Sequence, residues 1–192
     1  MNNGLEIAII GMAGRFPGAQ NVTEFWHNLQ QGVESIYFYG KEELTELGVK
    51  PDLLNNPNFV NASGKLDDID LFAADFFGFN PREAELLDPQ HRLFLESAWT
   101  ALENAGYDGE KYPGEIGVFG GAGMNGYMFN LYRNPQVRDT TNKYQLFLAS
   151  EKDFLTTRVS YKLNFEGPSV NLQTACSTPP AKAISHSPLS TL

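Results

Sequence analysis

The chain has 192 residues, of which 42% are hydrophobic and 19% charged, a balance typical of a globular protein and not of a disordered one. This length suffices for one sizeable core or for half of a larger two-part fold. The net charge is −9, and the acidic residues are spread along the chain, which argues against a nucleic acid or an anionic membrane as the main partner.

Cysteine usage and hydropathy indicate a cytoplasmic protein. One cysteine cannot form an internal disulfide, so the fold does not depend on an oxidising compartment. The N-terminal apolar run follows no basic residue and is too short for a signal peptide, and no apolar stretch approaches the length that spans a membrane. No pair of Cys or His residues has metal-ligand spacing, so we predict no metal site.

The first third of the chain predicts one strand, one helix and a long loop. The β-branched apolar run Glu6 to Gly11 predicts a buried strand. A helix is expected to begin near Asn21, with Glu24 placed as in a capping box. Its predicted buried face consists of Phe25, Trp26 and Leu29. Residues 40–64 are polar and rich in turn formers, which indicates a surface excursion.

The middle of the chain predicts two well-capped helices after an aromatic segment. The phenylalanines of residues 69–79 are expected in a core or an interface. Asn80-Pro81 and Asp88-Pro89 each combine a cap residue with proline at the first helical position. The second pair opens the strongest predicted helix, Pro89 to Ala105, which Gly106 ends. Its predicted apolar face is Leu95, Ala98, Trp99, Leu102 and Ala105.

The last part of the chain alternates strands with helices. Glu115 to Gly120 predicts a buried strand, residues 144–163 predict a helix in two pieces, and Ser169 to Gln173 predict a further strand. Alternation of this kind is typical of an α/β layered sheet.

Two patterns allow more than one interpretation. Gly121, Gly123 and Gly126 spell G-x-G-x-x-G after a predicted strand, but no second strand with a ribose-binding acid follows. We therefore favour glycine packing beside a site or an interface over nucleotide binding, and we predict no cofactor-binding residue. Of the three histidines, His27, His91 and His186, none is placed beside the cysteine by sequence, and His91 is expected to be a buried or capping residue.

Cys176 follows the strand pattern SVNLQ and precedes a position where a helix is expected. A turn from strand to helix exposes a side chain, and the first helical N–H groups and the helix dipole favour a thiolate. A lone cysteine is also commonly a small buried hydrophobic residue. On its local sequence Cys176 is thus a candidate nucleophile, with a structural role as the alternative.

Three long stretches decide between these interpretations: IAIIGMAGRFPGA with FWHNL, then DIDLFAADFFGFNPREAELLDPQHRLFLESAWTALENAGY, then RVSYKLNFEGPSVNLQTACS. In this order and spacing they resemble the N-terminal half of a β-ketoacyl synthase domain of modular type I polyketide synthases. The resemblance implies an α/β thiolase-like fold, layered α/β/α/β/α in the complete two-half domain. It assigns residues 5–178 to the N-terminal domain.

The resemblance also implies a reaction and partners. Cys176 matches the acyl-accepting cysteine, and Thr174 and Ala175 match the residues that lead into it. The cysteine takes an acyl chain from 4′-phosphopantetheine on an acyl carrier protein, and a malonyl-type thioester then condenses with it after decarboxylation. No cofactor is bound directly, and the complete domain is a homodimer. The first step needs a low-pKa thiol and N–H donors for the oxyanion, for which the Cys176 N–H is a candidate.

The chain departs from the family after Thr178. The family's two histidines and lysine that support decarboxylation lie in its second half, and the HGTGT motif is not present. Residues 179–192 form a Ser/Pro-rich string in which Pro179 and Pro180 resist a regular helix. We interpret this tail as a reading-frame shift or a truncated gene copy, and we expect the isolated chain not to complete condensation. The alternative is a non-catalytic fragment with a dimerisation or docking role.

Overall fold

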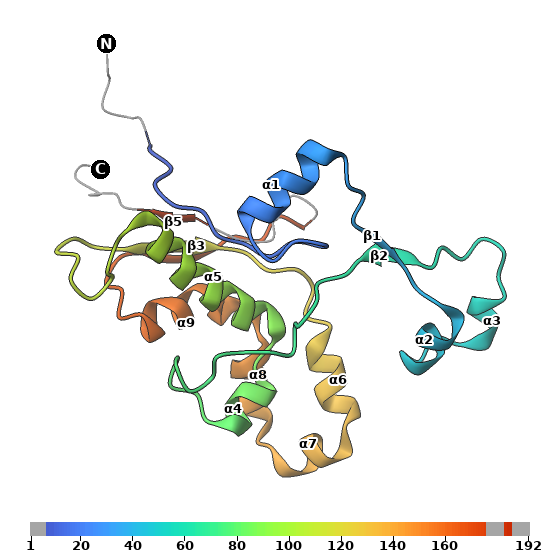
Figure 1. The fold of residues 1–192 in the computed structure, drawn as a ribbon. Coiled ribbons are helices and arrows are strands. Elements are labelled where there is room, and N and C mark those ends of the chain that lie inside the picture. Colours follow the sequence, from blue (N-terminus) through green and yellow to red (C-terminus); the bar gives the residue numbers. More distant parts are fainter. Residues whose placement is uncertain (1–6, 176–182, 186–192) are drawn as a thin grey trace. The chain divides into compact units, whose positions relative to one another are not determined.

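A computed structural model of the chain describes residues 7–175 and 183–185 (Figure 1). The chain divides into two compact units. The smaller unit is Gly14–Asp68, and the larger one contains the segments on either side of it. Each unit is described separately.

The larger unit is a small sheet covered by helices. Its helical segments are α4 (Pro81–Leu86), α5 (Pro89–Ala105), α6 (Tyr127–Arg133), α7 (Pro135–Thr140), α8 (Lys143–Ser150), the 3-10 turn η1 (Lys152–Phe154) and α9 (Leu155–Lys162). Its strands are β3 (Gly117–Gly120), β4 (Ser169–Asn171) and β5 (Ala183–Ser185), in the order β4-β3-β5. β3 runs parallel to β4 and antiparallel to β5. Helices α5 and α9 lie on one side of the sheet (Figure 1).

The main core lies between the sheet and these two helices. Leu95 of α5, Val118 of β3 and Leu155 and Val159 of α9 are almost completely buried in it. Phe77 and Phe79 belong to the same cluster and Phe72 packs against it, which confirms the expected core role for these three, whereas Phe76 is 61% exposed. A second cluster joins α4, α6 and α8 through Leu86, Leu131 and Leu146.

The predicted helix boundaries are confirmed where caps define them. The Asn80 side chain accepts from the Glu83 N–H and the Glu83 carboxylate accepts from the Asn80 N–H, which makes a capping box for α4. The Asp88 side chain accepts from the Gln90 N–H at the start of α5, and Gly106 ends that helix with a left-handed φ of 73°. Helix α5 has the predicted bounds. Trp99 is an exception to its predicted buried face, because it is 36% exposed.

The predicted first strand is wrong for the described residues. Residues 7–11 form no strand, and Ile7 and Ile9 are 87% and 81% exposed. β3 pairs with β4 on one side and β5 on the other, so it offers this run no partner, and the run does not pair with the outer edge of β4 or β5. The run instead lies alongside α5. The Met12 N–H donates to Asn104 Oδ1, and a Cβ on Gly11 would lie 2.5 Å from the Ala101 carbonyl oxygen.

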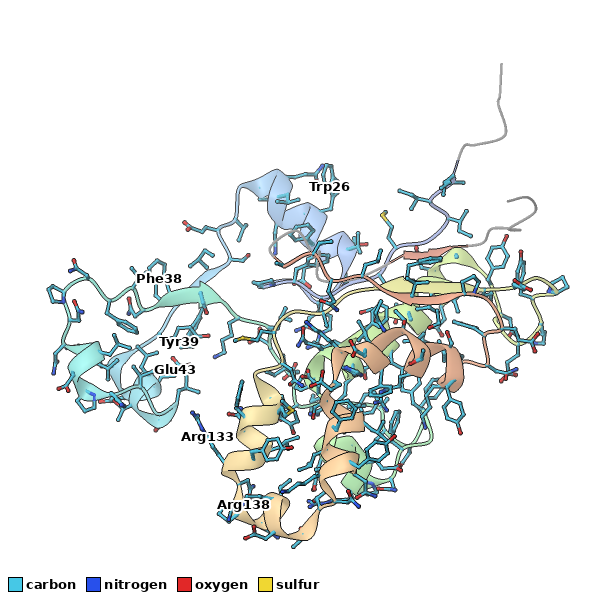
Figure 2. All side chains as sticks on the ribbon, turned by 180° about the vertical axis from the view of Figure 1, so that it is seen from behind. Trp26, Phe38, Tyr39, Glu43, Arg133 and Arg138 are labelled. Atoms are coloured by element: carbon cyan, nitrogen blue, oxygen red, sulfur yellow. The ribbon has the colours of Figure 1, made fainter. Side chains whose placement is uncertain are left out.

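The smaller unit contains α1 (Val22–Gln31), β1 (Ile36–Phe38), α2 (Lys41–Glu46), α3 (Pro51–Leu54) and β2 (Ala62–Gly64). β1 and β2 pair antiparallel, with Ile36 opposite Gly64. Glu43 of α2 lies beside this pair of strands (Figure 2), where it accepts a hydrogen bond from Tyr37 Oη at 3.0 Å and pairs with Lys65 at 3.3 Å. Residues 40–64, expected to be a surface excursion, therefore hold two short helices and the strand β2.

The predicted buried face of α1 is wrong. The Asn21 cap is confirmed, because its side chain accepts from the Glu24 N–H. Phe25 is half-buried and stacks on Phe16 at 4.0 Å between ring centroids, but Trp26 is 60% exposed (Figure 2). Successive residues of a helix are turned by about 100°. Phe16 therefore covers the side of α1 that carries Phe25 and leaves Trp26 exposed to solvent.

No helix within residues 7–175 is long and apolar enough to span a bilayer.

Candidate active-site edge

The candidate site lies at the carboxyl edge of the parallel pair β3 and β4. The Leu172 N–H donates to the Gly120 carbonyl oxygen at 2.8 Å, so the chain leaves both strands at the same edge. Residues 121–126 follow β3 there, and residues 172–175 follow β4. In α/β sheets this edge is where ligands and reactive side chains gather. The strand predicted to lead to Cys176 is thus confirmed, and it borders the glycine-rich loop.

The turn before β4 fixes how the two strands align. The Val118 N–H donates to the Pro168 carbonyl oxygen at 2.7 Å, and the Gly167 N–H donates to the Ile116 carbonyl oxygen at 3.2 Å. These bonds hold the register in which Val118 faces Ser169. A Cβ on Gly167 would lie 2.6 Å from the carbonyl carbon and oxygen of Ile116. Glycine is therefore required for this close approach.

Ala175 ends the described part of this edge with an unusual backbone. Its φ is +51°, in the left-handed region that residues other than glycine seldom adopt. Such residues concentrate at turns and functional sites, where surrounding structure holds them. Cys176 follows directly but lies outside the described residues, as does the predicted tail apart from 183–185. The roles of Cys176 and the boundary at residue 178 therefore stay predictions.

Two side chains hold the glycine-rich loop, one from α5 and one from the loop itself. Gln90 of α5 accepts a hydrogen bond from the Gly123 N–H at 2.8 Å. Asn125 donates from Nδ2 to the Ser150 carbonyl oxygen and accepts from the Met128 N–H. The Gly123 N–H, which a phosphate would need, is thereby already bonded. This arrangement supports the packing interpretation of the loop.

His91 lies in the first turn of α5 and is 2% exposed, which confirms the expected buried histidine. Burial, with a smaller contribution from the positive charge of Arg158, lowers the pKa of His91 to about 3. Its Nδ1 accepts a hydrogen bond from Arg158 Nε at 3.2 Å. The ring is therefore neutral at pH 7 and serves as a structural acceptor. His27 lies on α1 in the smaller unit, and His186 falls outside the described residues.

Gln90, Asn125 and Arg158 were not predicted from the sequence. The only local signal was the position of Gln90 in a first helical turn, which says nothing of the loop it reaches. Across the described residues, no group of three or more His, Cys, Asp or Glu side chains is arranged to hold a metal ion.

Comparison with known proteins shows what the chain resembles. Residues 5–188 match the family model of the β-ketoacyl synthase N-terminal domain. A component of the phenolphthiocerol/phthiocerol polyketide synthase of Mycobacterium tuberculosis is 49% identical over 179 residues, which cover 90% of this chain and 12% of that protein. Polyketide synthase PksN of Bacillus subtilis is 34% identical over 173 residues, which cover 90% of this chain and 3% of that protein.

Solved ketosynthases share the fold. Ketosynthase twelve of the bacillaene polyketide synthase of Bacillus amyloliquefaciens has a TM-score of 0.74 and 38% identity, over 88% of this chain and 29% of that one. The oxazolomycin ketosynthase domain OzmH KS7 of Streptomyces albus also has a TM-score of 0.74, with 32% identity, over 90% of this chain and 30% of that one. The chain thus spans under a third of these ketosynthases, and the expected thiolase-like α/β fold is confirmed. It belongs to the β-ketoacyl synthase family and corresponds to the N-terminal part of a polyketide ketosynthase domain.

Proposed function

We propose that this chain supplies the acyl-accepting part of a polyketide ketosynthase, with Cys176 as the nucleophile. The observation that carries the proposal is the left-handed turn at Ala175, which comes four residues after β4 and leads directly to Cys176. A tight turn at the end of a strand is the geometry that presents a nucleophile in α/β enzymes.

The proposed step is a thioester exchange. The Cys176 thiolate attacks the acyl carbonyl of a 4′-phosphopantetheine thioester carried by an acyl carrier protein. The bond from carbon to the Cys176 sulfur forms, the bond to the pantetheine sulfur breaks, and the released thiolate takes up a proton. The negative charge on the carbonyl oxygen needs preorganised N–H donors, for which the backbone at the start of the following segment is the candidate.

Condensation requires more than this step. A malonyl-type thioester has to lose CO₂, and its carbanion attacks the acyl-cysteine to give a β-ketoacyl thioester. By family resemblance, the two histidines and the lysine that support decarboxylation belong to the second half of the domain, and the complete domain is a homodimer. We therefore propose that residues 1–192 by themselves accept the acyl group and do not complete condensation. The cytoplasmic location stays a prediction.

Intact mass after incubation with hexanoyl-pantetheine tests the acyl transfer. We expect one hexanoyl adduct on the chain and none on Cys176→Ala, because the chain has one cysteine. Alkylation by iodoacetamide serves as the control for a reduced, accessible thiol. A folded chain that iodoacetamide alkylates, but that gains no hexanoyl group where a complete ketosynthase does, would overturn the proposal.

The second candidate function is a non-catalytic docking or dimerisation fragment. Exposed apolar side chains on the larger unit favour it, since Ile7, Ile9 and Leu172 are all more than half exposed. The same mass experiment separates the two functions, because a docking fragment has no reason to form the acyl adduct.

A further inference from the structure

Four buried side-chain oxygens lie on β4 and α9. They are Thr156 Oγ1 and Ser160 Oγ on α9, and Ser169 Oγ and Asn171 Oδ1 on β4. None of them has a hydrogen-bond partner among the residues that the structure describes. We call this set the β4–α9 polar cluster.

The two residues of the cluster on each element share a face of that element. Ser169 and Asn171 are two residues apart on a strand, so both side chains point to the same side of the sheet. Thr156 and Ser160 are four residues apart on a helix and lie one above the other. A hydrogen bond from Asn171 Nδ2 to the Asp153 carbonyl oxygen, just before α9, turns this face of β4 toward the helix.

The strand register brings Thr156 of α9 close to Asn171 of β4. Gly120 of β3 pairs with Asn171 of β4, and a Cβ built on Gly120 would lie 3.2 Å from the Thr156 methyl group. Thr156 therefore packs against the position beside Asn171. The structure places the polar atoms of both residues in the same buried layer between the sheet and the helix.

The spacing of residues along β4 and along α9 relates Ser160 to Ser169 in the same way. β4 follows α9 after a short connection, and Asn171 at its end bonds to Asp153 just before α9, so the strand and the helix run in opposite directions. From Asn171 to Ser169 the strand covers about 6.6 Å. From Thr156 to Ser160 the helix covers about 6 Å. This spacing puts Ser160 at the level of Ser169, one helical turn beyond Thr156 and Asn171.

Exposed hydroxyls of the same chain behave differently. Thr157 Oγ1 donates to the Phe154 carbonyl oxygen at 3.3 Å, and Thr100 Oγ1 donates to the Glu96 carbonyl oxygen at 3.0 Å. The buried hydroxyls of the polar cluster have no such backbone bond within the described ranges. Buried polar groups in folded proteins are almost always hydrogen-bonded to protein or to ordered water. Four unpaired oxygens in one layer therefore point to a polar ligand that both donates and accepts.

We propose that the β4–α9 polar cluster is a binding site for internal water. One water bridges Thr156 and Asn171, and a second bridges Ser160 and Ser169. Water fits because it is the small ligand that can donate to the Asn171 carbonyl oxygen and exchange hydrogen bonds with hydroxyls. The site joins α9 to the strand that leads to Cys176. It does not depend on the proposed acyl transfer.

The substitution Thr156→Val tests the site, because the proposal and its alternative predict opposite changes in the stability of the chain. Valine keeps the shape of threonine and removes the hydroxyl. If water bridges that hydroxyl, its loss should raise the unfolding equilibrium constant about fivefold, because one net hydrogen bond is lost. If the hydroxyl is dry and unpaired, the valine variant should be more stable than the original chain. Thr157→Val on the same helix is the matched control, because it makes the same change at an exposed position, where solvent replaces the lost hydroxyl bond to the Phe154 carbonyl oxygen.

Urea unfolding of the full chain and both variants gives the comparison. A high-resolution crystal structure of the unaltered chain provides a readout that needs no variant. Ordered water within hydrogen-bond distance of two of the four oxygens supports the proposal, as does a Thr156→Val loss larger than that of Thr157→Val. A Thr156→Val chain at least as stable as Thr157→Val, or a cluster without density for water, overturns it.

Discussion

Replacing Gly167 with alanine is expected to lower the free energy of unfolding by about 3 kcal/mol, the upper part of the usual range for overpacking. The added Cβ would lie 2.6 Å from the Ile116 carbonyl carbon and 2.7 Å from the Gly117 nitrogen. These are backbone atoms, so no side chain can rotate away and the strands have to separate. The bond from the Val118 N–H to the Pro168 carbonyl oxygen and the register of β4 should be disturbed with it.

Gly126→Ala is the matched control for this substitution. Gly126 has φ −72° and ψ −29°, which alanine adopts without strain, and no heavy atom lies within 4 Å of an added Cβ. We expect this variant to be neutral or slightly stabilised, because alanine reduces the entropy of the unfolded chain. Urea denaturation of both variants measures the difference. A Gly167→Ala chain as stable as Gly126→Ala would show that the turn before β4 relaxes freely.

A Gly167→Ala chain that still folds should also be impaired at the candidate site. Its β4 segment would be displaced relative to β3, and the turn at Ala175 with it. The rate of hexanoyl transfer to Cys176 should then fall in Gly167→Ala and remain unchanged in Gly126→Ala. Equal transfer rates in the two variants would show that the register of β4 does not affect acyl transfer to Cys176.

Features specified by neighbouring residues could be predicted from the sequence. The bounds of α5 follow from Asp88-Pro89 at one end and Gly106 at the other, and the structure has the same bounds. Asn134-Pro135 carries the same type of signal, yet α7 was not predicted, because its six residues show no apolar period. Local capping is thus informative where a long amphipathic pattern supports it.

Features that depend on distant residues could not be predicted. Whether the run at residues 7–11 forms a strand depends on which distant strand it can pair with, and both sides of β3 are paired with β4 and β5. The bond from the Gly123 N–H to Gln90 joins residues 33 positions apart, and the bond from Arg158 to His91 joins residues 67 positions apart. The sequence therefore indicates which edge carries the site, whereas the contacts that hold this edge come from the tertiary structure.

The stability of the chain is expected to decrease by about 2 kcal/mol between pH 7 and pH 5 because of His91 alone. Burial, together with the charge of Arg158, lowers the pKa of His91 to about 3 in the folded chain, whereas an unfolded histidine titrates near its ordinary value of 6.5. Between these values the unfolded chain binds a proton that the folded chain does not. The contribution of His91 to the free energy of unfolding is therefore complete above pH 6.5 and is lost as the pH falls toward 3.

Urea unfolding at pH 7, 6 and 5 of the original chain and of His91→Asn checks this expectation. Asparagine carries a carbonyl oxygen near the position of Nδ1, so it keeps an acceptor for Arg158 and removes the titrating group. Burial raises the pKa of Asp88, whose effect on stability has the opposite sign, but both chains contain Asp88 and its contribution cancels in the difference. The stability difference between the chains should shrink by about 2 kcal/mol from pH 7 to pH 5. Parallel curves would mean that the folded chain admits a proton at His91, and hence that the ring is reached by solvent.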